Sequence, residues 1–106
     1  MNKQIKLTKF EAEEIRYKID VIIDSGSEMW ESYKMTESEL EDLRLKIQKG
    51  IVIILNEKEY ILVKDEVKDL LTICECNYYS GFPEYKNDMI KLRKLYNKID
   101  LALINP

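Results

Sequence analysis

IVIILNEKEYILV, residues 51–63, is the stretch that decides how we expect this chain to fold. Two runs rich in β-branched and aromatic residues flank the polar trio at residues 56–58, which has the length of a hairpin loop. The first run is apolar at every position, as in strands that are central or covered by helices on both sides. We therefore predict a β-hairpin over about residues 51–63, with residues 4–7 as a candidate third strand.

Four helices are expected to pack around this small antiparallel sheet. Two of them begin at capping boxes, in which a threonine and a glutamate three residues later satisfy each other's backbone N–H groups. The boxes pair Thr8 with Glu11 and Thr36 with Glu39. Apolar residues then recur at steps of three and four, and Gly26 and Gly50 follow as terminators. The expected helices span about residues 9–25, 37–49, 66–80 and 84–103.

The third of these helices has an alternative. Asp65 can cap a helix over residues 66–80, with Val67 and Leu70 on its inner face. The segment TICECNYY, residues 72–79, is nevertheless rich in strand formers, so a third strand of a meander stays open there. In both cases we expect an α+β protein that forms a single compact domain over residues 1–106.

The strongest periodic pattern lies in the last expected helix. Apolar and aromatic residues recur there at steps of 4, 3, 4, 3 and 4, which is the period of a helix seam. The seam positions are Tyr85, Met89, Leu92, Tyr96, Ile99 and Leu103. This stripe either packs onto the rest of the chain or forms the interface of a homodimer. A structural or regulatory homo-oligomer assembled through the C-terminal helix is therefore our alternative hypothesis.

Composition argues against an enzyme. The chain has no histidine, which removes the commonest general base and the commonest zinc ligand. Its three glycines each follow an expected helix, so no glycine-rich phosphate loop is present. Cys74 and Cys76 are too close in sequence for a useful disulfide, which favours a reducing compartment. We expect no catalysis, no cofactor and no bound metal.

Charge is unevenly distributed along the chain. The net charge is −3, but residues 11–42 hold eleven acidic side chains against three basic ones. Residues 86–98 hold five basic side chains against one acidic one. The acidic part is either a solvated face or a surface that offers carboxylates where a partner binds phosphates. Direct binding of nucleic acid is not expected, because the helix before residue 51 opens with acids that phosphates repel.

Aromatic residues gather in the two longest expected connections, which hold Trp30, Tyr33, Tyr78, Tyr79, Phe82 and Tyr85. Trp30 is the only tryptophan and stands in SGSEMWESYKM, residues 25–35. It either closes the edge of the core or is exposed for a partner. For the exposed case we expect a partner-binding surface that combines these aromatics with nearby acids. Its residues are Glu28, Trp30, Glu31, Tyr33, Glu37 and Glu41.

The functional hypothesis is a small non-catalytic protein-binding module. A phage-type or immunity-type inhibitor, such as an anti-defence protein, would engage a basic or nucleic-acid-handling target through such a surface. The bias toward lysine over arginine suggests an AT-rich bacterium or phage. No uncharged run approaches the length of a membrane helix, so a cytoplasmic location is expected, in the host cytoplasm for a phage protein.

Overall fold

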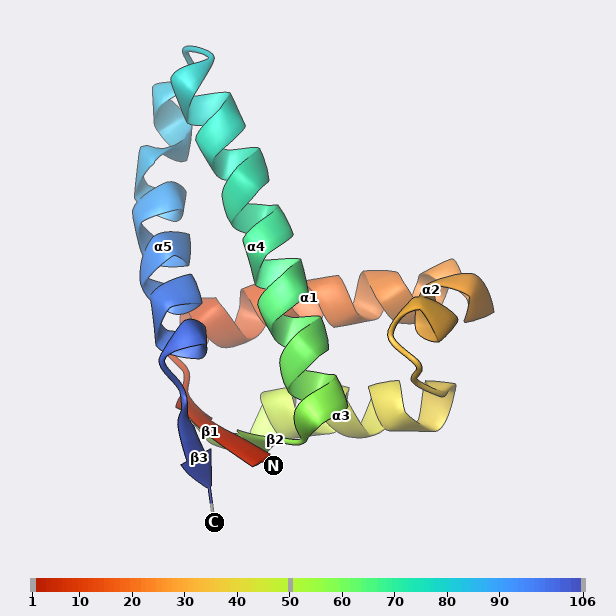
Figure 1. Cartoon of the computed structure of the whole chain (residues 1–106). Coiled ribbons are helices and arrows are strands. Elements are labelled where there is room, and N and C mark those ends of the chain that lie inside the picture. The colour runs from red at the N-terminus through yellow and green to blue at the C-terminus, as the bar shows by residue number, and fades with distance from the viewer. Residues whose placement is uncertain (1, 50, 106) are drawn as a thin grey trace.

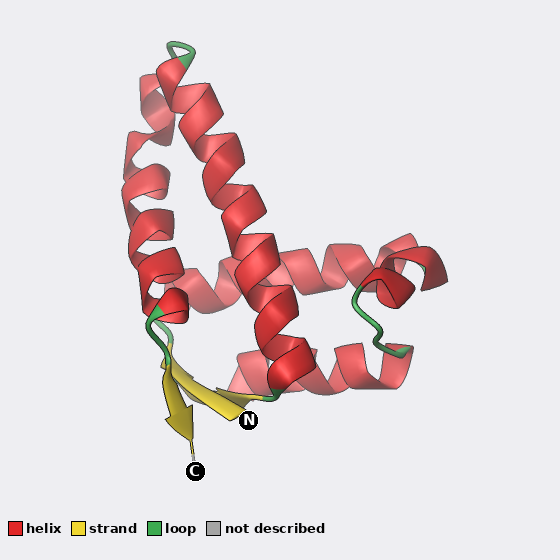
Figure 2. Cartoon of the chain, viewed as in Figure 1, coloured by secondary structure: helices red, strands yellow, loops and turns green. Residues whose placement is uncertain are grey.

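The computed structural model describes residues 2–49 and 51–105, and over these ranges the chain has the predicted α+β fold. Helices predominate over strands (Figure 2). The elements, in chain order, are β1 (Asn2–Lys6), α1 (Lys9–Ser25), α2 (Ser27–Ser32), α3 (Glu37–Lys49), β2 (Val52–Leu55), α4 (Glu57–Tyr79), the 3-10 turn η1 (Pro83–Tyr85), α5 (Lys86–Asp100) and β3 (Leu103–Asn105) (Figure 1).

The sheet has three antiparallel strands in the order β2-β1-β3. The candidate N-terminal strand is confirmed, and it is the central one. β2 was expected to be central or covered on both sides, but it lies at an edge. Ile53 and Leu55 are buried, whereas Val52 and Ile54 point to the open face and are exposed. The helices therefore cover one face of this sheet, as antiparallel sheets allow.

The predicted hairpin over residues 51–63 is wrong. Its second half is the start of α4, because Asn56 and Glu59 form a third capping box. The Asn56 side chain accepts a hydrogen bond from the Glu59 N–H at 2.9 Å, and the Glu59 carboxylate accepts one from the Asn56 N–H at 2.9 Å. Asp65, the expected cap, lies inside this helix, and the alternative over residues 66–80 is resolved as helix.

The two predicted capping boxes are confirmed. Thr8 and Glu11 exchange hydrogen bonds of 2.8 and 3.2 Å, and Thr36 and Glu39 exchange bonds of 3.1 and 3.2 Å. Gly26 ends α1 with a φ of 90°, a conformation that costs residues with a side chain more than glycine. The segment after it was expected to be irregular but forms α2. Gly50, the other expected terminator, lies outside the described residues.

The last helix is shorter than predicted at both ends. Pro83 opens η1, α5 begins at Lys86, and the helix ends at Asp100. The chain then turns into β3, which pairs with β1, so Leu103 belongs to a strand and not to a helical seam. The backbone groups of residues 103–105 form their hydrogen bonds with β1 in this arrangement. In a longer helix they would have formed them within the helix.

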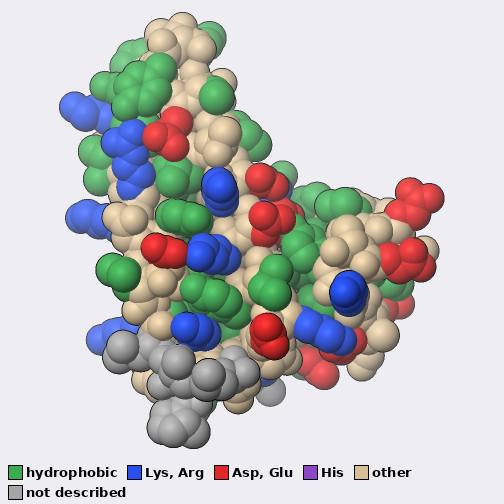
Figure 3. Space-filling view, in the orientation of Figure 1, with side chains coloured by type: hydrophobic (Ala, Val, Ile, Leu, Met, Phe, Trp, Pro, Cys, Tyr) green, Lys and Arg blue, Asp and Glu red, His purple; other side chains and the backbone are tan. Residues whose placement is uncertain are grey.

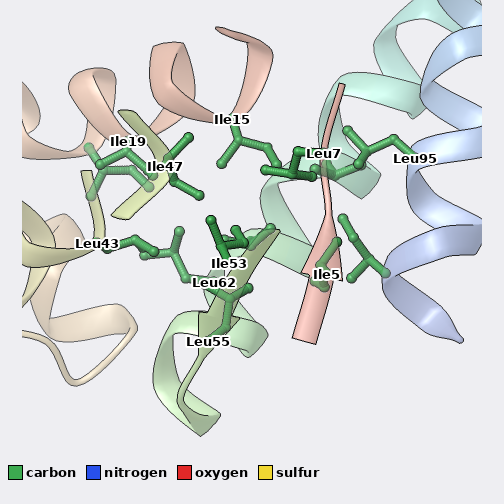
Figure 4. Close-up of a cluster of buried hydrophobic side chains, with 14 of the residues drawn as sticks. Ile5, Leu7, Ile15, Ile19, Leu43, Ile47, Ile53, Leu55, Leu62 and Leu95 are labelled. Carbon is green, nitrogen blue, oxygen red and sulfur yellow. The ribbon is translucent and has the colours of Figure 1, made fainter. Parts of the chain in front are cut away.

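The core lies where the sheet meets the helices. Figure 4 shows buried side chains from β1, β2, α1, α3, α4 and α5 converging there, among them Ile5, Ile19, Leu43, Leu62 and Leu95. α1 and α3 form the base of the molecule, while α4 and α5 form a helical hairpin that continues beyond them (Figure 1). We call the outer part of this hairpin, residues 72–90, the arm.

Candidate functional site

Trp30 stabilises the fold through contacts within the chain. Its side chain is half-buried against the core, and its indole N–H donates a hydrogen bond to the Ile22 carbonyl at 3.0 Å. The Gly26 N–H bonds to the Ile23 carbonyl instead, so Ile22 is one of the carbonyls at the end of α1 that need a partner from outside the helix. Trp30 supplies that partner and ties α2 back onto α1.

Tyr33 also faces inward, toward α4. Its hydroxyl donates to Asp65 at 2.8 Å and to Glu66 at 3.1 Å, and the Lys18 ammonium lies 3.8 Å from Glu66. Burial and the two carboxylates raise the pKa of Tyr33. Burial also raises the pKa of Glu66, against the opposing effects of Lys18 and the Tyr33 hydroxyl. The two aromatics expected to contact a partner are therefore used within the chain.

The four predicted acids gather at one end of the molecule, which we call the acidic corner: Glu28 and Glu31 on α2, Glu37 and Glu41 on α3. Figure 3 shows acidic side chains along the end of the molecule that carries α2. Glu41 pairs with Arg44 at 2.6 Å. Within the described part of the chain, Glu28, Glu31 and Glu37 are exposed and form no ion pair. The structure thus separates the predicted site into exposed acids and inward-facing aromatics.

Of the aromatics in the two predicted connections, the exposed ones lie instead at the tip of the arm, and Tyr17 on α1 is a further exposed aromatic in the described residues. Tyr79 is 69% exposed and Phe82 is 51% exposed. The Tyr78 and Tyr79 rings meet edge to face, with centroids 5.2 Å apart. Arg93 donates to the Tyr79 hydroxyl at 3.1 Å and to Glu75 at 2.8 Å, which holds this side of the tip in place. The aromatic cluster around the only Gly-Phe-Pro turn was the sequence signal for this surface.

A concave elbow separates the arm from the acidic corner. Lys18 and Glu66 meet where α1 crosses α4. Val21 follows Lys18 by about one turn toward α2, and Ile73 follows Glu66 by two turns toward the tip, so each continues the face that meets the other helix. Both are exposed. Figure 3 shows the outline hollowed between the two limbs. Val21 and Ile73 thus give each limb an exposed apolar side chain.

The predicted oligomer seam packs inside the chain. Met89, Leu92 and Ile99 are buried, and α5 runs along α4 over its length. Tyr85 and Tyr96 are half-buried on the same side. The periodic stripe thus accounts for the helical hairpin of the monomer.

Two open grooves flank the junction of β1 and α1. One, of about 610 Å³, lies between the start of α1 and the end of α3. The other, of about 380 Å³, lies between β1 and the end of α5. Both are lined by Lys6, Leu7 and Thr8.

Residues 2–49 and 51–105 contain neither a metal-binding cluster nor a membrane-spanning helix. No three histidine, cysteine or acidic side chains there are placed to hold a metal ion together. None of the helices in these ranges has the length and apolar character needed to span a membrane. Cys74 is half-buried, and burial raises the pKa of its thiol, whereas Cys76 is exposed.

Comparison with protein-family models, with curated proteins and with solved structures found no match to this chain.

Proposed function

We propose that this chain is a small non-catalytic protein-binding module that holds a basic protein target in the elbow. The observation that carries the proposal is the uncovered aromatic tip, where Tyr79 and Phe82 are exposed on an arm that projects beyond the core. Tyrosine and arginine are enriched among residues that dominate binding energy, and Arg93 stands beside Tyr79. The tip thus has the composition of an interface centre.

The acidic corner has a different part in this proposal. Glu28, Glu31 and Glu37 are exposed carboxylates, so they are suited to attracting a basic surface over distance. Exposed charges at the edge of an interface change association rate and salt dependence more than the strength of the final contact. We assign steering to the corner and most of the affinity to the arm and elbow.

The target class follows from the same charges. Proteins that handle nucleic acid present basic surfaces, and clustered carboxylates can occupy the positions that phosphates take. An inhibitor of the phage or immunity type, acting in the cytoplasm as an anti-defence protein, fits this arrangement. The homo-oligomer hypothesis gains no support from α5, since its stripe is occupied by α4.

Affinity capture with matched variants tests the proposal. The wild type, a tip variant (Tyr79→Ala with Phe82→Ala), a corner variant (Glu28→Lys with Glu31→Lys) and a control are used as baits in extracts of AT-rich bacteria. The control is Ile61→Ala, which alters an exposed residue in the first half of α4, away from the arm. Circular dichroism confirms that each bait is folded.

A target is expected to bind the wild type and the control equally. The tip variant should bind it at least about tenfold more weakly, the loss expected when interface aromatics are removed. The corner variant should bind more slowly, and the difference should shrink at high salt because the steering is Coulombic. Equal retention of every captured protein by all four baits would rule the proposal out.

A further inference from the structure

We propose that the larger groove, between α1 and α3, binds an acidic amphipathic peptide segment of a second protein. We call it the basic groove. It combines three cationic side chains, Lys6, Lys9 and Arg16, with an apolar lining that includes Leu7, Ile47 and Ile51. Its volume, about 610 Å³, lies in the range of roughly 300–1,000 Å³ that ligand sites occupy.

The cations of the groove are available to a partner. Lys6, Lys9 and Arg16 are exposed, and none of them forms an ion pair with an acid in the described ranges. Glu13 is the one acidic residue among those that line the groove. A segment that carries several carboxylates would therefore meet an excess of positive charge, which favours its approach and orientation.

The apolar lining of the basic groove favours a partner that carries apolar side chains as well as charge. Leu7 and Ile47 are buried and form part of the core, whereas Ile51 is 66% exposed at the side of the groove. A partner that carried only charge would leave Ile51 in water. A segment that alternates acidic and apolar residues covers Ile51 and removes its apolar surface from water, which favours binding.

Strand addition to the sheet is a less suitable mode of binding at this end. Ile54 lies in the edge strand β2, and the Lys46 ammonium donates a hydrogen bond to its carbonyl at 3.2 Å. A lysine held against an edge strand hinders pairing with another chain. The segment is thus expected to lie across side chains in the groove, with its apolar residues toward Ile51.

The basic groove and the elbow lie on different sides of α1. Lys18 points toward Glu66 on α4, at the elbow. Arg16 precedes it by two residues, which places it about 200° around the helix. The two surfaces can therefore be occupied at the same time, and the inference is independent of the proposed function. Together they would let the chain connect a basic protein and an acidic one.

Fluorescence anisotropy with labelled peptides tests this inference. The probe is a twelve-residue peptide that alternates glutamate pairs with leucine, and a second peptide replaces each leucine by serine at the same charge. The groove variants are Lys9→Glu with Arg16→Glu, and separately Ile51→Ser. The control, Lys86→Glu with Lys94→Glu, makes the same charge change on exposed residues of α5.

The leucine peptide should bind the wild type and the α5 control with similar Kd. The double groove variant should raise Kd at least about tenfold, and Ile51→Ser by several fold, because each removes one of the two required features. The serine peptide should bind at least about tenfold more weakly than the leucine peptide. The tip variant (Tyr79→Ala with Phe82→Ala) and the corner variant (Glu28→Lys with Glu31→Lys) should bind the leucine peptide as the wild type does.

Three outcomes would overturn the inference. Equal binding of the leucine and serine peptides would mean that the groove attracts charge alone. Tighter binding of duplex DNA than of the leucine peptide, lost in the double groove variant, would assign the groove to nucleic acid. A wild type that self-associates in sedimentation, through a contact that the double groove variant abolishes, would assign it to the acidic corner of a second copy.

Discussion

At the scale of single residues, Trp30 is the position whose role changes most once its contacts are known. Trp30→Phe keeps an aromatic ring but removes the hydrogen bond from the indole N–H to the Ile22 carbonyl at the end of α1. We expect a loss of about 1–2 kcal/mol in the free energy of unfolding, the cost of leaving a partly buried carbonyl without its donor. Urea denaturation followed by far-UV circular dichroism measures it.

The neighbouring Met29→Ala is the control, since Met29 is on the same helix and exposed. It should stay within about 0.5 kcal/mol of the wild type. If Trp30→Phe is as stable as this control, the indole hydrogen bond does not anchor α2.

Glu66 makes the free energy of unfolding depend on pH. Burial raises its pKa in the folded chain, so the folded state holds the proton more tightly than the unfolded state does. The stability from this group is complete below its unfolded pKa and is lost as pH rises through the folded pKa. Glu66→Gln removes the titration, so the variant should gain stability relative to the wild type as pH rises above about 4.5, the ordinary pKa of a glutamate.

Urea denaturation at several pH values below and above this ordinary pKa measures the change. Glu57→Gln makes the same chemical change at an exposed acid in the first turn of α4, away from Glu66, and should leave the pH profile close to that of the wild type. Wild-type and Glu66→Gln curves that stay parallel across the range would show that burial does not control the titration of Glu66.

At the scale of the element, the start of α4 shows where a local pattern was misjudged. Asn56 followed three residues later by Glu59 has the spacing of a capping box, and from Glu59 onward the buried positions recur at helical steps. Ile61 and Val63 favoured a strand because they are β-branched. The burial of Leu62, Val63 and Val67 supports the helix more than this propensity opposes it.

Replacing the cap tests this account of α4. Asn56→Ala removes the side chain that accepts the Glu59 N–H, and we expect it to cost about 1–2 kcal/mol of unfolding free energy. Asn56→Asp retains an acceptor and should stay within about 0.5 kcal/mol of the wild type. Chemical denaturation of both variants provides the comparison, and equal stabilities would argue against a capping role.

Other elements differ in how far sequence could predict them. The boxes at Thr8 and Thr36 are local, so the starts of α1 and α3 were predictable. β3 depends on pairing with β1, about a hundred residues away in sequence, and no local pattern marks it. The inward turn of Trp30 and Tyr33 depends on partners in α1 and α4 in the same way.

At the scale of the whole molecule, the distribution of charge was predictable but its geometry was not. Sequence identified an acidic and a basic segment, and the acids at residues 28–41 do gather at one end. It could not show that the exposed side chains of Tyr79 and Phe82 lie on the other limb, or that Lys6, Lys9 and Arg16 border one groove. These arrangements arise because α1 packs on α3 and α4 at the same time, which brings distant residues together.

At the same scale, the packing of α5 on α4 can be tested in a way that distinguishes a folded monomer from a homodimer. Leu92 is 2% exposed within the chain, so Leu92→Lys places an unpaired charge in the core of the helical hairpin. We expect it to cost several kcal/mol and to unfold the chain, which circular dichroism detects. Ile90→Lys, on the exposed side of the same helix, should remain folded. If Leu92 instead formed a homodimer seam, sedimentation would show a dimeric wild type and a Leu92→Lys variant that is a folded monomer.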